Sequence, residues 1–232
     1  TIMKTLISCC LLISVAWSTQ AQWKFEFVAG PSLTTFTGKE KKEWGGTDSN
    51  PKMVLRGNLG FRAERLLSKK FLAGGGVAFA LKGTVYEGDE EYYNSVTYEL
   101  EVLKVKYTKM LSYIDVPLYI KYVASEKLKL LAGVQPSFLL SAKIKNDDNA
   151  RTAFPGLPKT EDAKDYYTLF DMAVMLGPHY QISDNVAIQG LIMPGILKVA
   201  KGDIYGRGSM EEEKYKVNNA SLSFTFIYLI RQ

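Results

Sequence analysis

The feature that most constrains the fold of this chain is an alternation of residue types with a period of two. It is clearest in the stretch YIDVPLYIKY, at residues 113–122. One parity carries Ile114, Val116, Leu118, Ile120 and Tyr122, and the other carries Tyr113, Asp115, Pro117, Tyr119 and Lys121. Because successive side chains of a β-strand point to opposite faces, this pattern predicts a strand with one apolar face. The opposite face carries charges of both signs.

The same alternation recurs along the chain and predicts about eight strands. The cleanest other example runs from Leu128 to Ile144, where every even position is apolar and most odd positions are small or polar. This parity places Ala142 and Ile144 on the apolar face. The expected strands lie near residues 23–36, 53–66, 71–86, 106–123, 128–145, 166–182, 186–199 and 216–231.

The connections between these strands alternate strictly between long and short. The short ones are 67–70, 124–127 and 183–185, and the long ones are 37–52, 87–105, 146–165 and 200–215. In an up-and-down sheet this order gathers all short turns at one end. Outer-membrane barrels sort their connections in this way, with short periplasmic turns and longer extracellular loops. We therefore predict an all-β fold, an eight-stranded antiparallel up-and-down transmembrane β-barrel.

The N-terminal segment differs in kind from the rest of the chain. A lysine precedes a short apolar run that ends in small and polar residues, a pattern typical of a cleaved signal peptide. We assign the signal peptide to residues 1–21 and the barrel domain to residues 22–232; a buried first helix is the alternative. Both cysteines, Cys9 and Cys10, lie in the signal segment. The exported chain would then carry no disulfide, which suits an envelope protein.

In a lipid setting the apolar faces point outward and the polar faces line the interior of the barrel. Charges of both signs could pair across that interior and offset part of their desolvation cost. We expect Asp115 either to bond Arg56 or Arg62 or to meet water. The predicted lumenal polar network comprises Glu26, Arg56, Arg62, Glu64, Asp115, Lys121 and Asp171.

Aromatic residues gather near the short-turn ends of the expected strands, as in the interfacial girdle of a membrane barrel. They are Trp23, Phe25, Phe71, Tyr122, Tyr180 and Tyr228. Prolines are harder to place, because proline cannot donate to a β-ladder and a closed barrel has no free edge. We expect a local bulge at Pro117, or a carbonyl bonded to a lumenal partner, and the same at Pro136, Pro178 and Pro194.

Few residues could carry chemistry. The single histidine, His179, is expected on the lumenal face near the short turns, whereas a barrel enzyme would place its reactive groups at the outer rim. With one histidine and no cysteine after residue 21, we predict no metal, no cofactor and no enzymatic activity. The net charge of +5 comes without a basic stripe, which argues against nucleic-acid binding. The acidic runs 87–91 and 211–214 are solvated loop tips or, alternatively, bind divalent cations at the lipopolysaccharide surface.

Two stretches resemble a known family. SYIDVPLYIKY, followed after a short turn by LKLLAGVQPSFLLSAKIK, is similar to the centre of the PorT-type outer-membrane β-barrels of the Bacteroidota. OmpA-type eight-stranded barrels share much of the pattern. The chain departs from such barrels by ending in FIYLIRQ rather than on an aromatic residue. The resemblance implies an outer-membrane location in a Gram-negative cell envelope, and the founding member is linked to protein secretion across that membrane.

These observations favour a barrel of structural or interaction type, PorT-like and linked to protein secretion or envelope integrity. Its expected partners are outer-membrane lipid, lipopolysaccharide and an envelope or secretion-complex protein. We expect no pore, because eight strands enclose a space just wide enough for side chains. The alternative is a soluble exported barrel that binds a small apolar ligand. The direction of Leu130, Val134 and Phe138 distinguishes the two: outward for the membrane barrel, inward for the soluble carrier.

Overall fold

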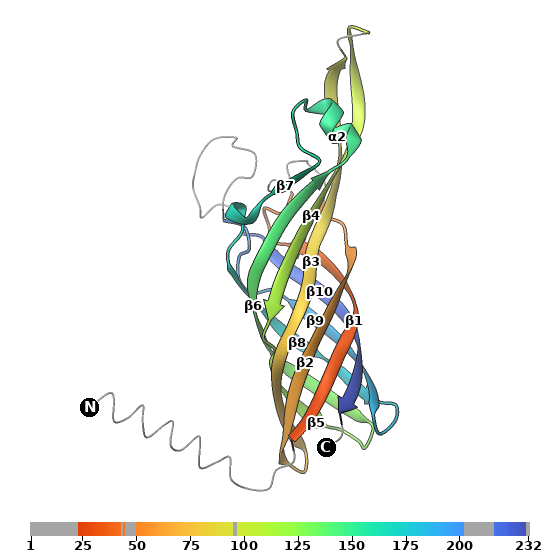
Figure 1. The fold of residues 1–232 in the computed structure, drawn as a ribbon, viewed down its shortest axis with the longest axis vertical. Helices are drawn as coiled ribbons and strands as arrows, with labels where there is room; N and C mark the ends of the chain where they lie inside the picture. The colour runs from red at the N-terminus through yellow and green to blue at the C-terminus, as the bar shows by residue number, and fades with distance from the viewer. Residues whose placement is uncertain (1–22, 43, 45–49, 95–96, 202–215, 231–232) are drawn as a thin grey trace, which may run out of the picture.

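The computed structural model describes residues 23–42, 44, 50–94, 97–201 and 216–230, and shows a β-barrel with short additions at one end (Figure 1). The predicted signal peptide lies outside these residues. The elements are β1 (Trp23–Thr37), β2 (Val54–Ser68), β3 (Phe71–Asn94), β4 (Glu99–Asp115), β5 (Leu118–Val123), β6 (Leu128–Asn146), α2 (Asp148–Ala153), β7 (Thr160–Asp162), the 3₁₀-helix η2 (Lys164–Tyr166), β8 (Phe170–Gln181), β9 (Val186–Pro194) and β10 (Asn218–Ile230).

The strands close into a ring. Each pairs antiparallel with its neighbours in the order β2-β1-β10-β9-β8-β6-β4-β3, and the pairing of β2 with β3 completes the circle. β5 continues the line of β4 between β3 and β6, so that the two together form one side of an eight-membered ring. The predicted eight-stranded up-and-down barrel is confirmed. Among the described residues, no helix is long and apolar enough to cross a bilayer.

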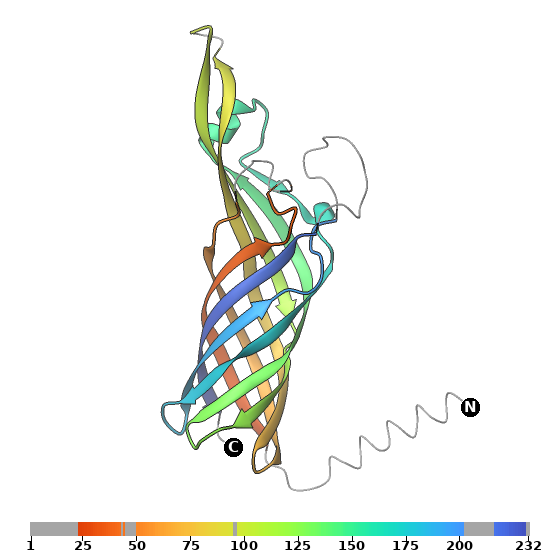
Figure 2. The same ribbon diagram turned by 180° about the vertical axis from the view of Figure 1, so that it is seen from behind.

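The two ends of the barrel differ. Figures 1 and 2 show the short turns gathered at one end, where β1 begins and β10 ends. At the other end β3 and β4 run on beyond the rim as a hairpin that pairs from Glu87↔Lys106 to Asn94↔Glu99. The sequence predicted a loop over 87–105, so this prediction was wrong. The two strands continue because their backbones pair with each other beyond the rim, where no other described strand pairs with them. The acidic run 87–91 therefore lies in a strand, while 211–214 lies outside the described residues.

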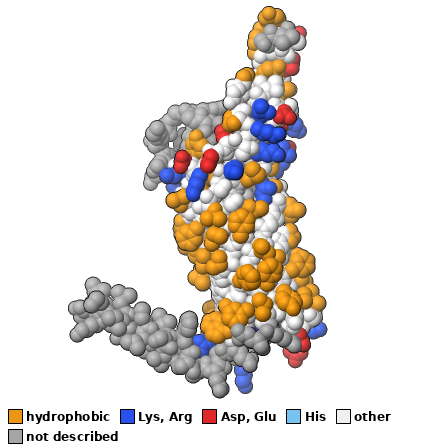
Figure 3. Space-filling view, viewed as in Figure 1, with side chains coloured by type: hydrophobic (Ala, Val, Ile, Leu, Met, Phe, Trp, Pro, Cys, Tyr) orange, Lys and Arg blue, Asp and Glu red, His pale blue; other side chains and the backbone are white. Residues whose placement is uncertain are grey.

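The outer surface of the barrel is apolar. Leu130, Val134 and Phe138 are 49%, 39% and 48% exposed, whereas Gln135 between them is only 6% exposed. Figure 3 shows hydrophobic side chains covering the body of the barrel, with charged side chains concentrated towards its two ends. The apolar faces thus point outward, the orientation expected of a membrane barrel and the opposite of a soluble carrier of apolar ligands.

A β-bulge in β6 reverses its faces near the long-loop end. Tyr113 pairs with Leu139 and Ser112 pairs with Ser141, which leaves Leu140 as an extra residue. Beyond it Ala142 and Ile144 are buried, each at 1% exposure, and Lys143 and Lys145 are exposed. The prediction that Ala142 and Ile144 lie on the outer apolar face was wrong, because one inserted residue shifts the side-chain alternation by one position.

The barrel accommodates its prolines without local bulges. The β4–β3 pair Asp115↔Ala78 and the β5–β3 pair Leu118↔Gly75 keep the same register on either side of Pro117. The Pro117 carbonyl accepts a hydrogen bond of 3.1 Å from the amide of Gly76 in this ladder. Each such proline removes one backbone N–H donor from the ladder. The hydrogen bonds of the residues on either side of it keep the strand register unchanged. The expected bulge is therefore absent at Pro117, and bulges are likewise absent from the strand pairings around the other three prolines, Pro136, Pro178 and Pro194. The alternative, a carbonyl left without its ladder donor and bonded to a lumenal partner, stays a prediction.

Candidate functional site

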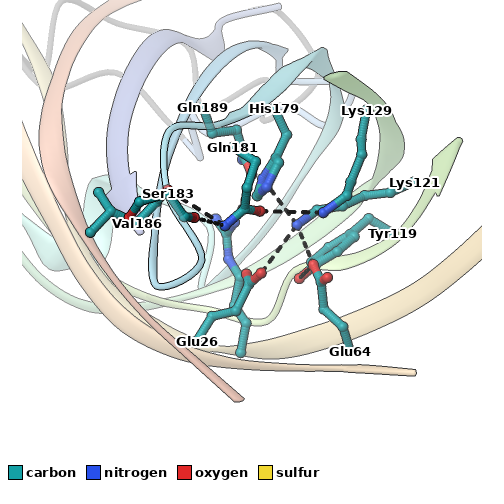
Figure 4. Close-up of polar contacts among 11 residues, drawn as sticks. Glu26, Glu64, Tyr119, Lys121, Lys129, His179, Gln181, Ser183, Val186 and Gln189 are labelled. Atoms are coloured by element: carbon teal, nitrogen blue, oxygen red, sulfur yellow. Dashed lines mark hydrogen bonds and ion pairs between the residues drawn. The ribbon is translucent and has the colours of Figure 1, made fainter. Parts of the chain in front are cut away.

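The barrel interior holds the densest group of polar side chains, and its most charged part lies near the short turns. Lys121 of β5 forms ion pairs with Glu64 of β2 and, at 3.4 Å, with Glu26 of β1. Its Nζ also lies 3.2 Å from Nδ1 of His179 in β8. Figure 4 shows these side chains converging on the Lys121 ammonium from different sides of the barrel. The Tyr119 hydroxyl donates a hydrogen bond of 2.9 Å to Glu64. We name Glu26, Glu64, Tyr119, Lys121 and His179 the lower network.

Small residues make room for the lower network. A Cβ added at Gly74 in β3 would lie only 2.6 Å from the ring of Tyr119, so the aromatic ring packs directly on the glycine backbone. The guanidinium of Arg62 lies 5.5 Å from the centre of the same ring and donates a hydrogen bond of 3.2 Å to Gln189. The strand alternation thus directs Tyr119 and Arg62 into the barrel, and the missing side chain of Gly74 leaves the space that the Tyr119 ring fills.

A second polar cluster lies further along the barrel. Asp115 forms an ion pair of 3.1 Å with Lys82 and accepts a hydrogen bond of 2.7 Å from Gln135. Lys82 also donates to the hydroxyl of Ser137 at 2.9 Å. The partner of Asp115 is therefore Lys82, and neither Arg56 nor Arg62 as expected. The sequence carried a signal for Lys82, since it shares its parity with the small inward residues Gly74, Gly76, Ala78 and Ala80 of β3.

The remaining predicted lumenal residues have other surroundings. Asp171 accepts a hydrogen bond of 2.8 Å from Asn219, which also lies 3.3 Å from the Tyr113 hydroxyl. Arg56 is half-buried and forms no ion pair with any described residue. The structure thus joins Glu26, Glu64 and Lys121 directly. Arg62 lies beside this group, opposite Glu26 in the β1–β2 pairing and over the Tyr119 ring, and the other predicted members have separate partners or none among the ion pairs of the described residues. A polar cavity of about 30 Å³ beside Arg62, Lys82 and Asp115 could hold about one or two water molecules.

An aromatic cluster, named here the Trp44 plug, lies at the long-loop end. Trp44 packs edge-on against Phe36 and Tyr167, with ring centres 5.3 and 5.1 Å away. The ammonium of Lys109 lies 4.0 Å from the Trp44 ring centre and donates a hydrogen bond of 3.1 Å to the Trp44 carbonyl. Beside the plug, burial raises the pKa of the Glu161 carboxyl in β7, and the charge of Lys109 opposes this shift. Sequence reasoning missed Trp44, because it lies in a segment expected to be a long loop.

The buried charges of the described interior balance. Four carboxylates, Glu26, Glu64, Asp115 and Asp171, accompany four cations, Arg62, Lys82, Lys109 and Lys121. Charge balance of this kind offsets part of the cost of removing ions from water. Within the described ranges, no group of three or more histidine, cysteine and acidic residues is placed to hold a metal ion. The arrangement packs and pairs the described side chains across the barrel interior.

The predicted aromatic residues lie on the outside of the barrel. All six are exposed to between 37% and 53%. Phe71 and Tyr122 pack against each other on neighbouring strands, with ring centres 5.5 Å apart and ring planes inclined by 53°. Trp23, Phe25, Phe71, Tyr122, Tyr180 and Tyr228 all lie in the parts of their strands towards the short turns.

Comparison with known families agrees with this geometry. Residues 20–201 match the family model described as the outer membrane protein beta-barrel domain. The chain belongs to this family. Its members are named for the architecture seen here, a barrel of the outer membrane, and the predicted localisation in the outer membrane is thereby confirmed. A search of curated proteins found no match.

Several solved structures of the same architecture are similar to this family member. Ail, the attachment invasion locus protein of Yersinia pestis, in complex with the heparin analogue sucrose octasulfate, is 12% identical with a TM-score of 0.45; the match covers 90% of this chain and 99% of Ail. Neisserial surface protein A is 12% identical with a TM-score of 0.45, covering 88% and 96%. Outer membrane protein W of E. coli is 14% identical with a TM-score of 0.36, covering 91% and 100%.

Proposed function

We propose that this outer-membrane barrel is a non-conducting protein of structural or interaction type that presents its long-loop end to partners outside the cell. The observation that carries the proposal is the filled interior. The lower network, the Lys82–Asp115 cluster and the Trp44 plug follow one another along the barrel axis. The cavity beside Arg62, Lys82 and Asp115 is of water size. An interior of packed, paired side chains supports a scaffold for the loops and no enzymatic role.

The outer surface supports contact with lipopolysaccharide on the long-loop side. Lys143 and Lys145 face outward just beyond the apolar band of β6. Lysines at this level would meet phosphate groups of the outer leaflet, which an ammonium attracts as a compact charge. The exposed aromatic residues near the short turns would then occupy the opposite, periplasmic interface, as aromatic girdles do.

The absence of a pore is tested by electrical recording. The purified protein, inserted into planar lipid bilayers at neutral pH, should give no steady channels, because packed side chains occupy the interior at three successive levels. The Trp44→Ala variant should stay silent too, since the Lys82–Asp115 cluster and the lower network remain. Steady, voltage-independent channels in either protein would refute the non-conducting proposal.

The PorT-like role in protein secretion or envelope integrity rests on the sequence resemblance, which is carried mainly by residues 112–145. It predicts a stable complex with another envelope protein. Affinity purification of the tagged protein from native membranes, after chemical cross-linking, should recover a component of a secretion or envelope complex in amounts comparable to the bait. Recovery of lipid and lipopolysaccharide only would favour a purely structural barrel.

A further inference from the structure

The hairpin of β3 and β4 beyond the barrel rim has one covered edge and one open edge. On the β4 side, the Asn149 side chain donates a hydrogen bond of 2.8 Å to the Lys104 carbonyl, and the Asp147 amide donates one of 3.1 Å to the Lys106 carbonyl. On the β3 side, the pairing with β2 ends at Ala80, and a single bridge joins Val85 to Lys52. From Gly88 to Tyr93, no other described strand pairs with the outer edge of β3.

The faces of this hairpin are also unequal. Gly88 pairs with Val105, and Val105 is fully buried in a cluster that includes Ala150 of α2, so that face is occupied. On the other face Asp89, Glu91 and Tyr93 lie beside Lys104, Val102 and Leu100. Tyr93, Leu100 and Val102 are 57%, 71% and 64% exposed. Figures 1 and 3 show the hairpin standing clear of the barrel, with apolar side chains near its tip.

An open strand edge presents unpaired amides and carbonyls, and proteins usually protect such edges from pairing with other chains. Here the protection is charge of one sign. Residues 87–106 contain six acidic and two basic residues, a net charge of 2 − 6 = −4. Two copies pairing edge to edge would bring Asp89, Glu90 and Glu91 against the same carboxylates, and like charges on paired strands repel. Phosphate-bearing lipids would be repelled for the same reason.

We propose that the Gly88–Tyr93 edge of β3 is a docking site for an extended segment of a partner protein, bound by β-strand addition. Backbone hydrogen bonds to the edge would supply affinity, and side chains on alternate positions would supply selectivity. On the exposed face the segment places lysine or arginine beside Asp89 and Glu91, and an apolar residue beside Tyr93. The partner is therefore a protein with an exposed, basic, alternating segment. This inference deepens the proposed interaction role and rests on it.

The test uses the full-length protein in nanodiscs of zwitterionic phospholipid, with empty nanodiscs as a blank. The probes are three peptides of about eight residues: one alternating lysine with valine, the same peptide with glutamate for lysine, and the lysine peptide with alternate amides N-methylated. Calorimetry should show binding of the lysine peptide that weakens with salt, and about tenfold weaker binding or none for the other two. Hydrogen exchange should slow at the amides of residues 88–93.

The charge-reversed variant Asp89→Lys/Glu91→Lys should prefer the glutamate peptide, while the matched variant Glu126→Lys, in a turn at the opposite end, should behave as the wild type. Equal binding of the N-methylated peptide, no binding of the lysine peptide, or self-association through the hairpin would overturn the docking site. The comparison between the lysine peptide and its N-methylated form uses the wild-type protein. It therefore still tests the docking site if the charge-reversed variant does not fold. A negative result in the peptide-binding test would refute the docking site but would not affect the bilayer recordings, which test the non-conducting barrel. The two proposals can therefore be refuted independently.

Discussion

At the scale of single residues, Lys121 has the most unusual surroundings. Its side chain is fully buried and contacts the carboxylates Glu26 and Glu64 together with the ring of His179. One cation therefore offsets two buried anions. Removing one partner of a buried ion pair is more destabilising than replacing the whole pair, because the remaining charge has lost its compensation.

We expect Lys121→Met to lower the free energy of unfolding by on the order of 3–5 kcal/mol. Urea titration in detergent micelles, followed by tryptophan fluorescence, measures it. The control is Lys129→Met, which removes a half-buried lysine whose contact with Gln181 is 3.5 Å long. Adding Glu64→Gln to Lys121→Met should restore part of the loss. An unchanged urea midpoint for Lys121→Met would show that the carboxylates need no cation.

At the scale of elements, the Leu140 bulge decides what β6 presents at each level. On the short-turn side of the bulge the strand places apolar residues outward. On the long-loop side it places Lys143 and Lys145 outward and Ala142 and Ile144 inward. The change occurs where the barrel leaves the apolar band and meets the Trp44 plug. A bulge is a means of redirecting side chains without ending the strand.

The bulge predicts a specific labelling pattern. Single cysteines at positions 142–145, in a background with Cys9→Ser and Cys10→Ser, should react with a water-soluble maleimide at 143 and 145 and remain unreactive at 142 and 144. The protein is labelled folded, in nanodiscs, and unfolding in urea should make all four positions reactive. Reaction at 142 and 144 instead would mean that the alternation runs through β6 without interruption.

At the scale of the whole molecule, the up-and-down topology separates two ends with different properties. The short-turn end carries the exposed aromatic residues, the start of β1 and the end of β10. The long-loop end carries the Trp44 plug, α2 and the projecting hairpin. In outer-membrane barrels the short turns face the periplasm. The hairpin would therefore stand outside the cell.

This orientation predicts which end reacts in intact cells. In the same cysteine-free background, Tyr98→Cys near the hairpin tip should label with a membrane-impermeant maleimide, because Tyr98 is 75% exposed on that side. Glu126→Cys in the turn between β5 and β6 should label only after the outer membrane is permeabilised. The opposite pattern would place the hairpin in the periplasm and remove the basis for an extracellular docking site.

The strand pattern and the two faces of each strand could be read from the chain, because side-chain alternation is a local property of extended backbone. The shared parity of Asp115 and Lys121 follows from the same alternation. The eight-stranded closure and the outward direction of the apolar faces were predicted from the order of the connections and from the residues on each face, and the structure decided between the membrane barrel and the soluble carrier. The end of the strand before the turn at 124–127 was predicted at Val123, where the structure has it, and the strand predicted to end at residue 66 runs two residues further, to Ser68. The predicted boundaries failed at the β3–β4 hairpin, where polar and apolar residues mix and nothing in the pattern marks the barrel rim.

Contacts across the lumen required the folded barrel. That Lys82 meets Asp115, and that one lysine serves both Glu26 and Glu64, depends on strand register and on the stagger around the ring. Neither quantity is encoded in the period of any single strand. The Leu140 bulge also required the folded barrel, because an extra residue in β6 is recognised only by comparing its pairing with the neighbouring strand β4. Local periodicity thus sets the face of each side chain, whereas its neighbours are set by how eight separate strands are aligned.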